Sequence, residues 1–520
     1  MQTTSRVLRL AAVFIMTWGL LQGGVTGATN SWVAPSTSGN WNAAANWSAG
    51  TVPVATDNIV VSGSSGKSPW TMSAATLEVS DIVYNLSGYD RRLRNDSTAG
   101  DSFLALNGGG VNGGMLINLS TSRNFSINAF GSGATPHLLT VQLKTSGTFN
   151  SEGTASDTVL GGNGLVINAP VAEIGGSRSL KLTGAGAITL SGTNSYTGGT
   201  TVNMTGGTVL MSGSGTAGVF NGTLGSGASA LTVQSGTLDL GTSIQRVGAV
   251  VLTGGVIQSG TLTGDSYTAI GSGTATVNSV LAGAGGLTKS GSGKLVLGGI
   301  NSYTGATSVT GGLLIVSGNI AGSACNVAGG TLRGTGTTGA ITAQASGSVG
   351  PGTETTTGIL SAASLDLQSG AHLAIRLGGT VAGTGYDRLA VAGGISLAGD
   401  LDVSLVHGFT PSGATQNPET HNYNLDGDKF FIMLGTGAAG AFGNVGSADP
   451  YLPGFGTVRV GEREFAISFS GNALANTFTG GSDLVLMAIP EPGTNGMIVL
   501  GLGVMIGVCG YRHCKRDWKR

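Results

Sequence analysis

The pentapeptide Asn-Ser-Tyr-Thr-Gly occurs twice, at residues 194–198 and 301–305, and its surroundings repeat with it. Aligning residues 180–202 with 287–309 gives 12 identities in 23 positions. The shared positions carry glycines, such as Gly184 and Gly291, and apolar residues, such as Leu190 and Leu297. Alternating apolar residues indicate half-buried strands, and glycines between them indicate turns. This self-similarity predicts a solenoid, in which each coil buries its apolar face against its neighbours.

The composition agrees with many short strands. Glycine supplies 95 of the 520 residues, and charged residues make up only 9%. Windows such as 231–241 and 395–406 alternate apolar and small polar residues, as half-buried strands do. A flexible linker of similar composition would lack these regularly spaced apolar residues. We therefore expect an all-β fold.

The repeated pentapeptide has two interpretations. Asn bonds its own backbone in turns, Tyr covers a turn with an amphipathic ring, and Thr-Gly lets the chain re-enter a strand. These properties suit matching corners of two coils. The alternative is a surface ligand site that is used twice. Because the identities around both copies fall on apolar strand residues and turn glycines, the sequence favours corners.

The order of residues from Leu180 and from Leu287 resembles the autotransporter-associated β-strand repeat of large exported bacterial proteins. The resemblance implies a right-handed parallel β-helix. At about 22 residues per coil, the interval of 107 residues between the copies predicts about five coils.

Both ends of the chain carry targeting patterns. Arg6 and Arg9 precede an apolar run at 10–21 and small residues, so 1–28 is expected to be a signal peptide. A second apolar run, 497–510, is followed by five Lys or Arg residues. This run predicts a short transmembrane helix whose basic end stays in the cytoplasm.

The C-terminal segment resembles the PEP-CTERM sorting domain, through Pro490, Glu491 and Pro492, the apolar run and the basic end. The resemblance implies recognition and processing by an exosortase, a membrane-embedded cysteine protease-transpeptidase. The predicted location is the cell envelope, the outer surface or the medium, with transient anchoring by the C-terminal helix.

These patterns divide the chain into five predicted parts. They are the signal peptide (1–28), an N-terminal β region with a cap (29–160), a β-helix (161–320) that contains the repeats 180–213 and 287–318, further coils with an aromatic-rich closing module (321–487), and the sorting and anchor segment (488–520).

Three of the six tryptophans, Trp32, Trp41 and Trp47, lie near the predicted start of the mature protein. The open end of a solenoid must be capped, so we expect these rings to cover it. The alternative is a sugar-stacking platform formed with nearby Asn residues, which would make an extracellular polysaccharide a partner.

Catalytic and metal-binding patterns are weak. Gly-x-Gly-x-x-Gly occurs at 213–218 and 334–339, among other places as expected for a glycine-rich chain, but neither of these two matches opens a helix. Asp426 and Asp428 lie in a segment that partly resembles a calcium loop, yet Met433 occupies the position of the bidentate Glu. A turn before a strand at 429–434 is therefore favoured, and weak calcium binding by the two carboxylates is the alternative. Cys325 has an apolar context typical of a buried thiol. We therefore expect no catalytic residue, no cofactor and no metal site.

Charge argues against nucleic acid as a partner. Residues 29–511, without the signal peptide and the basic end, contain 17 Lys or Arg residues and 24 Asp or Glu residues. The one basic cluster, Arg91, Arg92 and Arg94, is expected to form a solvated surface turn.

The sequence thus predicts a non-enzymatic exported β-solenoid of the cell surface or matrix. A carbohydrate-binding adhesin is the first alternative. A β-helical polysaccharide lyase or hydrolase is the second, because that fold hosts such enzymes.

Overall fold

The structure is a computed structural model. It describes residues 28–33, 39–63, 70–72, 76–86, 91–95, 100–108, 115–118, 120, 125–128, 137–152, 156–157, 162–211, 224–420, 422–435, 437–448 and 451–490. Within these ranges the chain is all-β, apart from one 3-10 turn, η1 (Ala44–Asn46). The chain divides into two compact units, 1–307 with 318–322 and 308–317 with 323–520.

The first unit begins with sixteen strands that precede the first repeat. They are β1 (Thr29–Ser31), β2 (Gly39–Asn40), β3 (Asn58–Gly63), β4 (Trp70–Met72), β5 (Thr76–Val79), β6 (Asp81–Leu86), β7 (Arg91–Asn95), β8 (Ser102–Leu106), β9 (Met115–Asn118), β10 (Phe125–Ile127), β11 (Leu139–Leu143), β12 (Gly147–Ser151), β13 (Ser156–Asp157), β14 (Gly162–Asn163), β15 (Leu165–Ile167) and β16 (Val171–Glu173).

The rest of this unit holds both pentapeptides. Its strands are β17 (Leu180–Gly184), β18 (Ala187–Leu190), β19 (Thr200–Met211), β20 (Leu231–Asp239), β21 (Ile244–Leu252), β22 (Gly255–Gln258), β23 (Thr261–Ala269), β24 (Thr274–Val277), β25 (Val280–Ala282), β26 (Leu287–Lys289), β27 (Lys294–Leu297) and β30 (Asn319–Ile320). Strand β28 (Thr307–Val309) spans the division between the units.

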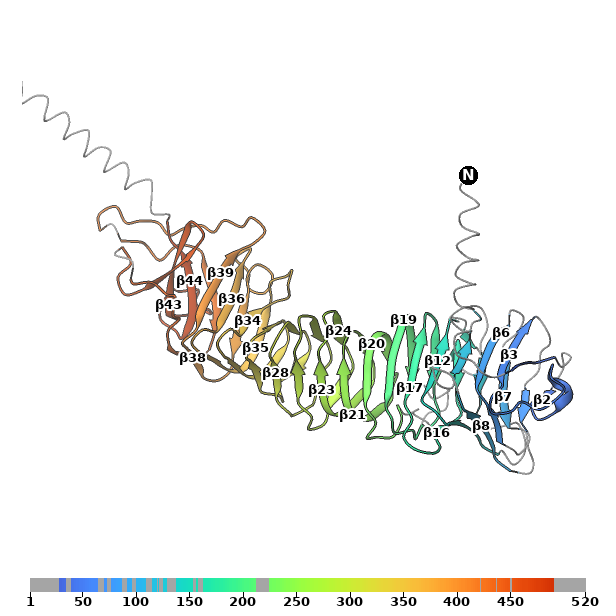
Figure 1. Cartoon of the computed structure of the whole chain (residues 1–520). Coiled ribbons are helices and arrows are strands. Elements are labelled where there is room, and N and C mark those ends of the chain that lie inside the picture. Colours follow the sequence, from blue (N-terminus) through green and yellow to red (C-terminus); the bar gives the residue numbers. More distant parts are fainter. Residues whose placement is uncertain are drawn as a thin grey trace, which may run out of the picture. The chain divides into compact units, whose positions relative to one another are not determined.

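Strands of the first unit pair in parallel ladders that advance along the chain. One ladder runs β1, β3, β6, β9, β12, β17 and β19. A second runs β2, β4, β7, β10, β15, β18 and the same β19. A third holds β5, β8, β11 and β16. Apart from β13 and β14, which form an antiparallel pair of their own, consecutive strands from β1 to β18 belong to different ladders. This arrangement is compatible with a parallel β-solenoid (Figure 1).

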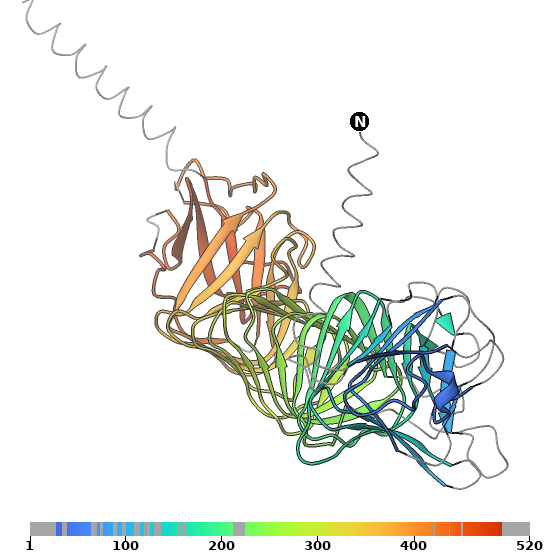
Figure 2. The same cartoon turned by 45° about the vertical axis from the view of Figure 1, so that its right-hand side comes forward.

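The register between the two repeats confirms the predicted number of coils. Parallel partners follow one another from Leu180 to Thr200, Leu231, Val250, Tyr267 and Leu287, which makes five steps. All six residues are buried. The segment between the copies therefore continues the same stack with less similar sequence, and Figure 2 shows its strands side by side in a second view.

The glycines that the repeats share lie where successive coils approach most closely. Gly184 has φ +111°, and a Cβ there would lie 2.1 Å from the carbonyl oxygen of Ser151 in the preceding coil. Gly291 has φ +70°, and its Cβ would lie 2.4 Å from the carbonyl oxygen of Ile270. A side chain is excluded at both positions by space and by backbone conformation.

The prediction of a surface turn at the arginine cluster is wrong. Residues 91–95 form strand β7, which pairs with β4 and β10. Leu93 is 0% exposed, whereas its neighbours Arg92 and Arg94 are only half-buried. The alternation places the leucine in the core and the two charged residues on the outer face, and it overrides the high local charge.

The second unit begins with parallel coils as well. Its strands are β29 (Leu313–Val316), β31 (Cys325–Val327), β32 (Thr331–Gly334), β33 (Thr337–Ala343), β34 (Ser348–Pro351), β35 (Ile359–Leu367), β36 (His372–Leu377), β37 (Arg388–Val391), β38 (Ile395–Leu397), β39 (Asp400–Leu405), β40 (Lys429–Leu434), β41 (Ala438–Gly440), β42 (Gly456–Val460), β43 (Arg463–Gly471) and β44 (Asp483–Ala488).

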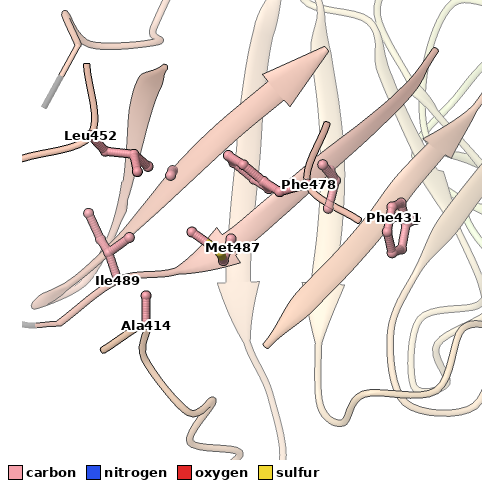
Figure 3. Packing of buried hydrophobic residues seen from close by; sticks show 8 residues of the cluster. Ala414, Phe431, Leu452, Phe478, Met487 and Ile489 are labelled. Atoms are coloured by element: carbon pink, nitrogen blue, oxygen red, sulfur yellow. The ribbon is translucent and has the colours of Figure 1, made fainter. Parts of the chain in front are cut away.

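Pairing changes from parallel to antiparallel at the end of this unit. Strand β40 pairs in parallel with β37 on one side and antiparallel with β44 on the other. Strands β42, β43 and β44 continue antiparallel. Their core contains Phe431, Leu452, Phe478, Met487 and Ile489, which Figure 3 shows gathered at these strands. The aromatic-rich segment thus forms a cluster of its own after the last parallel coils.

Candidate functional site

The asparagine of each pentapeptide is a buried acceptor for the preceding coil. The Oδ1 atom of Asn194 accepts a hydrogen bond of 2.8 Å from the backbone N–H of Val171. The Oδ1 atom of Asn301 accepts one of 3.0 Å from the backbone N–H of Leu281. These side chains are 3% and 7% exposed. In each corner the side-chain oxygen of the asparagine takes the place of a backbone carbonyl of the ladder. It accepts the backbone N–H of the preceding coil, which would otherwise be buried without an acceptor.

The tyrosine of each pentapeptide points into the core rather than covering the turn. Tyr196 is 0% and Tyr303 1% exposed. Each hydroxyl is 2.7 Å from the hydroxyl of the threonine four residues later, Thr200 or Thr307. Burial raises the pKa of the Tyr196 hydroxyl above its ordinary value. The prediction that an amphipathic ring caps the turn is therefore wrong, because the whole ring is enclosed.

The glycine of each pentapeptide lies against backbone of the previous coil. A Cβ at Gly198 would lie 2.4 Å from the carbonyl carbon of Arg178, and one at Gly305 would lie 2.4 Å from the backbone nitrogen of Gly286. Asn and Tyr are buried in both copies, whereas the backbone of Gly198 is exposed and that of Gly305 is half-buried. The side chains that reach solvent are therefore those of the serine and the threonine of each pentapeptide. The geometry supports coil corners and leaves the alternative of a ligand site little surface.

The three N-terminal tryptophans pack together. Their ring centroids lie 5.0 to 6.2 Å apart, and the Nε1 atom of Trp47 donates a 2.8 Å hydrogen bond to the carbonyl of Trp41. The backbone N–H groups of Trp32 and Trp41 donate to Val60 and Thr71, in the second strands of two ladders. Trp41 and Trp47 are buried and Trp32 is half-buried. This packing favours a cap, and carbohydrate contact stays a prediction in which Trp32 offers the accessible ring.

The carboxylates of the calcium-like segment are bound by the chain itself. Asp426 accepts hydrogen bonds from the backbone N–H of Thr415, at 2.7 Å, and from its hydroxyl. These bonds hold the pKa of Asp426 below its ordinary value. Asp428 accepts a 2.6 Å bond from the N–H of Ser412. Both carboxylates therefore fasten the turn before β40, the strand predicted at Lys429–Leu434.

The remaining candidates for chemistry are dispersed. Burial raises the pKa of the Cys325 thiol to about 12, which keeps it protonated and unreactive at neutral pH. In the described part of the chain, no three His, Cys, Asp or Glu side chains come together as metal ligands would.

A buried ion pair that sequence analysis missed organises the second unit. Asp387 is 0% exposed, and its Oδ2 atom lies 2.8 Å from the Nε atom of Arg376. The same guanidinium donates to the carbonyl of Pro351, at the end of β34, and to that of Thr356, in the loop that follows. No local pattern marks this pair, because Arg376 lies on β36 and Asp387 lies just before β37, eleven residues later.

The neighbours of Asp387 hold the next coil. The N–H of Phe431 donates to the hydroxyl of Tyr386 at 3.3 Å, and the Nε atom of Arg388 donates to the carbonyl of Phe431 at 2.9 Å. Residues 386–388 therefore fasten the loop after β34 on one side and strand β40 on the other.

Of the predicted sorting triplet, only Pro490 is described, directly after the buried Ile489. Glu491 and Pro492, the apolar run 497–510 and the signal peptide up to residue 27 lie outside the described residues. Among the residues that are described, no helix has the length and hydropathy needed to span a membrane.

The two repeats of the chain are similar to repeats of known proteins. A family model described as passenger-associated-transport-repeat matches residues 180–211 and 287–316. The adhesin BmaC autotransporter of Brucella suis biovar 1 (strain 1330) is 46% identical over 92 residues, which is 17% of this chain and 3% of that adhesin. The chain thus carries two repeats of the autotransporter-passenger type, and it covers a small part of the relative's length.

Proposed function

We propose that this chain is an exported, non-enzymatic surface protein of adhesin type, built as a right-handed parallel β-helix. The observation that carries the proposal is the pair of passenger-associated-transport repeats, set five coils apart in one parallel register. Crossover connections between parallel strands of one sheet are right-handed in the great majority of proteins, which supports the handedness. The local similarity to an adhesin supports the surface role.

The hydrogen bonds of several buried or loop-forming polar side chains support a non-enzymatic role. The asparagines of the corners, Asp387, Asp426 and Asp428 are all engaged in hydrogen bonds that fix backbone segments. A glycan-cleaving site would instead need carboxylates directed together toward one substrate bond.

We further propose that residues 488–520 sort the protein through an exosortase. Strand β44 ends at Ala488, and the backbone N–H of Ile489 still bonds to the carbonyl of Glu464. The triplet Pro490, Glu491 and Pro492 therefore follows the closing module directly, where a membrane-bound processing enzyme would find it next to the folded body.

The test is fractionation of bacteria that contain an exosortase and express the full chain or a chain lacking 489–520. The full chain is expected in the envelope fraction and accessible to protease added to intact cells, and the truncated chain is expected in the medium. Glu491→Ala keeps the apolar run 497–510 and loses only recognition, so it should stay membrane-bound, unprocessed and protected from the added protease. Glu419→Ala, on an exposed loop, should behave as the full chain does. Identical partition of all forms would refute sorting by this tail.

A further inference from the structure

A pair of tyrosines, one half-buried and one exposed, lies on the closing module, in the second unit. The rings of Tyr423 and Tyr451 have centroids 5.8 Å apart and are tilted by 58°. Tyr423 packs against the buried cluster of Phe431, Leu452 and Phe478, whereas Tyr451 is 45% exposed. The backbone N–H of Tyr423 donates a 2.9 Å bond to the carbonyl of Tyr451, which fixes the two segments to each other.

The loop that carries Tyr423 is held in one conformation by its own hydrogen bonds. Asn424 donates from its backbone to the carbonyl of Thr415 at 2.7 Å and from its amide to the hydroxyl of Thr415 at 2.8 Å. Thr415 in turn donates to Asp426. At the base of the loop, the N–H of Ala414 bonds to the carbonyl of Ala488 in β44. A ligand would therefore meet a preformed surface and lose little affinity to ordering the loop.

The groups around the pair are mainly uncharged hydrogen-bonding groups. Asn422 and Asn424 are exposed beside Tyr423, and Leu425 is 43% exposed. The sequence close to the pair is acidic, with Asp426 three residues after Tyr423 and Asp449 two residues before Tyr451. Tyrosine offers a rigid ring face with a polar tip, and amides offer both donors and acceptors. A sugar ring presents the complement, a face of C–H groups edged by hydroxyls.

We propose that Tyr423, Tyr451 and Asn424 form a binding site for a neutral polysaccharide. The acidic Asp426 disfavours polyanionic chains, such as nucleic acid or polyuronates. A protein partner would need about 800 Å² on this side with an apolar core. Here the large apolar side chains exposed on the described part of the two segments are only Leu425 and Tyr451. A sugar ring or two fits that extent. The proposal rests on the proposed surface location, which gives the site access to such chains.

The test is native gel electrophoresis of the purified full-length protein in gels cast with hydroxyethyl cellulose or mixed-linkage β-glucan, and with alginate as the anionic comparison. We expect retardation by at least one neutral polymer and none by alginate. Tyr451→Ala should raise the Kd for the polymer, obtained from mobility against polymer concentration, about tenfold or more, because it removes an aromatic anchor. Tyr451→Phe should retain the binding.

Leu474→Ala is the matched control, since Leu474 is an exposed apolar residue of the same unit, at 100% exposure. It should bind as the unchanged protein does, and thermal melting should be equal for all variants. The site is refuted if no neutral polymer retards the protein, if Tyr451→Ala binds normally, or if Tyr451→Ala impairs only capture of a protein partner. Cell fractionation tests the sorting segment and does not depend on Tyr451, so its outcome is the same whether or not the polysaccharide site exists. Failure of the site and failure of the proposed sorting are therefore distinguishable.

Discussion

The two Asn-Ser-Tyr-Thr-Gly corners share their construction and differ in what surrounds it. In both, a buried asparagine accepts from the previous coil, a buried tyrosine bonds to a threonine four residues later, and a glycine touches backbone. Ser195 and Ser302 both donate their backbone N–H to the previous coil, to Val171 and Leu281. The repeat therefore preserves contacts between successive coils.

The surroundings differ at an inward position and at the outer edge. Leu182 of the first copy corresponds to Lys289 of the second, and both are buried. The ammonium of Lys289 donates to the carbonyls of Ser290 and Gly291, at 2.7 and 3.0 Å.

At the edge, Thr197 donates its N–H to the carboxylate of Glu173, whereas Thr304 donates to the carbonyl of Gly283. A corner that is fixed by the pentapeptide itself thus tolerates different neighbours.

The largest effect is expected from removing the enclosed rings. Tyr196→Ala and Tyr303→Ala should each lower the free energy of local opening by about 3–5 kcal/mol, because they leave a cavity in the core. Hydrogen exchange of the Ser195 and Ser302 amides measures this opening, with the untouched corner of each variant as its internal control. Tyr→Phe at either position should cost only about 1 kcal/mol, the hydroxyl bond. Clearly unequal losses at the two corners would show that their construction is not equivalent.

The second-largest effect is expected from removing the asparagine side chains of the two corners. Asn194→Ala and Asn301→Ala each leave a buried N–H of the previous coil without its acceptor, which costs about 1–3 kcal/mol. Exchange should therefore accelerate at the amides of Val171 and Leu281. The exposed serines of the same pentapeptides supply the control, because Ser195→Ala and Ser302→Ala should change stability by at most about 0.5 kcal/mol. Equal effects of the serine and asparagine variants would contradict the role assigned to the amide.

A smaller effect is expected at the inward position that distinguishes the copies. Burial lowers the pKa of the Lys289 ammonium, so its desolvation offsets much of what its hydrogen bonds contribute. Lys289→Met, which keeps the length of the side chain and removes its charge, should change the opening of the second corner by about 1 kcal/mol or less. Urea unfolding and exchange at Ser302 measure it. A loss as large as that of Tyr303→Ala would mean that the ammonium is an essential part of the corner.

The corners could be predicted from the sequence because their determinants are local. A glycine in close contact, an inward leucine and a buried tyrosine recur at fixed spacing, and their alignment predicted the five coils that the register shows. The strand that contains Arg92 and Arg94 was predicted as a turn because their charge hid the alternation around Leu93. Tyr423 and Tyr451, like Arg376 and Asp387, come together through strand pairing and loop closure between different segments. Such pairs leave no periodic signal in one sequence.

The smallest effect is expected from acid, and it should separate the two copies. Hydrogen bonds from Thr197 and Arg178 hold the pKa of Glu173 below its ordinary value although partial burial opposes them. A carboxyl group with a depressed folded pKa contributes stability above its unfolded pKa of about 4.3, and this contribution is lost as pH falls through the folded pKa. Opening at Ser195 should therefore become easier below about pH 4, relative to Ser302.

Glu173→Gln removes the titrating group and keeps an acceptor, so it should abolish that difference between the copies. Hydrogen exchange of the Ser195 and Ser302 amides, compared across pH within one sample, measures the difference between the two corners in each protein. If the two corners keep the same relative protection from neutral to acidic pH, then Glu173 does not contribute to the stability of the first corner. The first corner, like the second, is then stabilised by the pentapeptide alone.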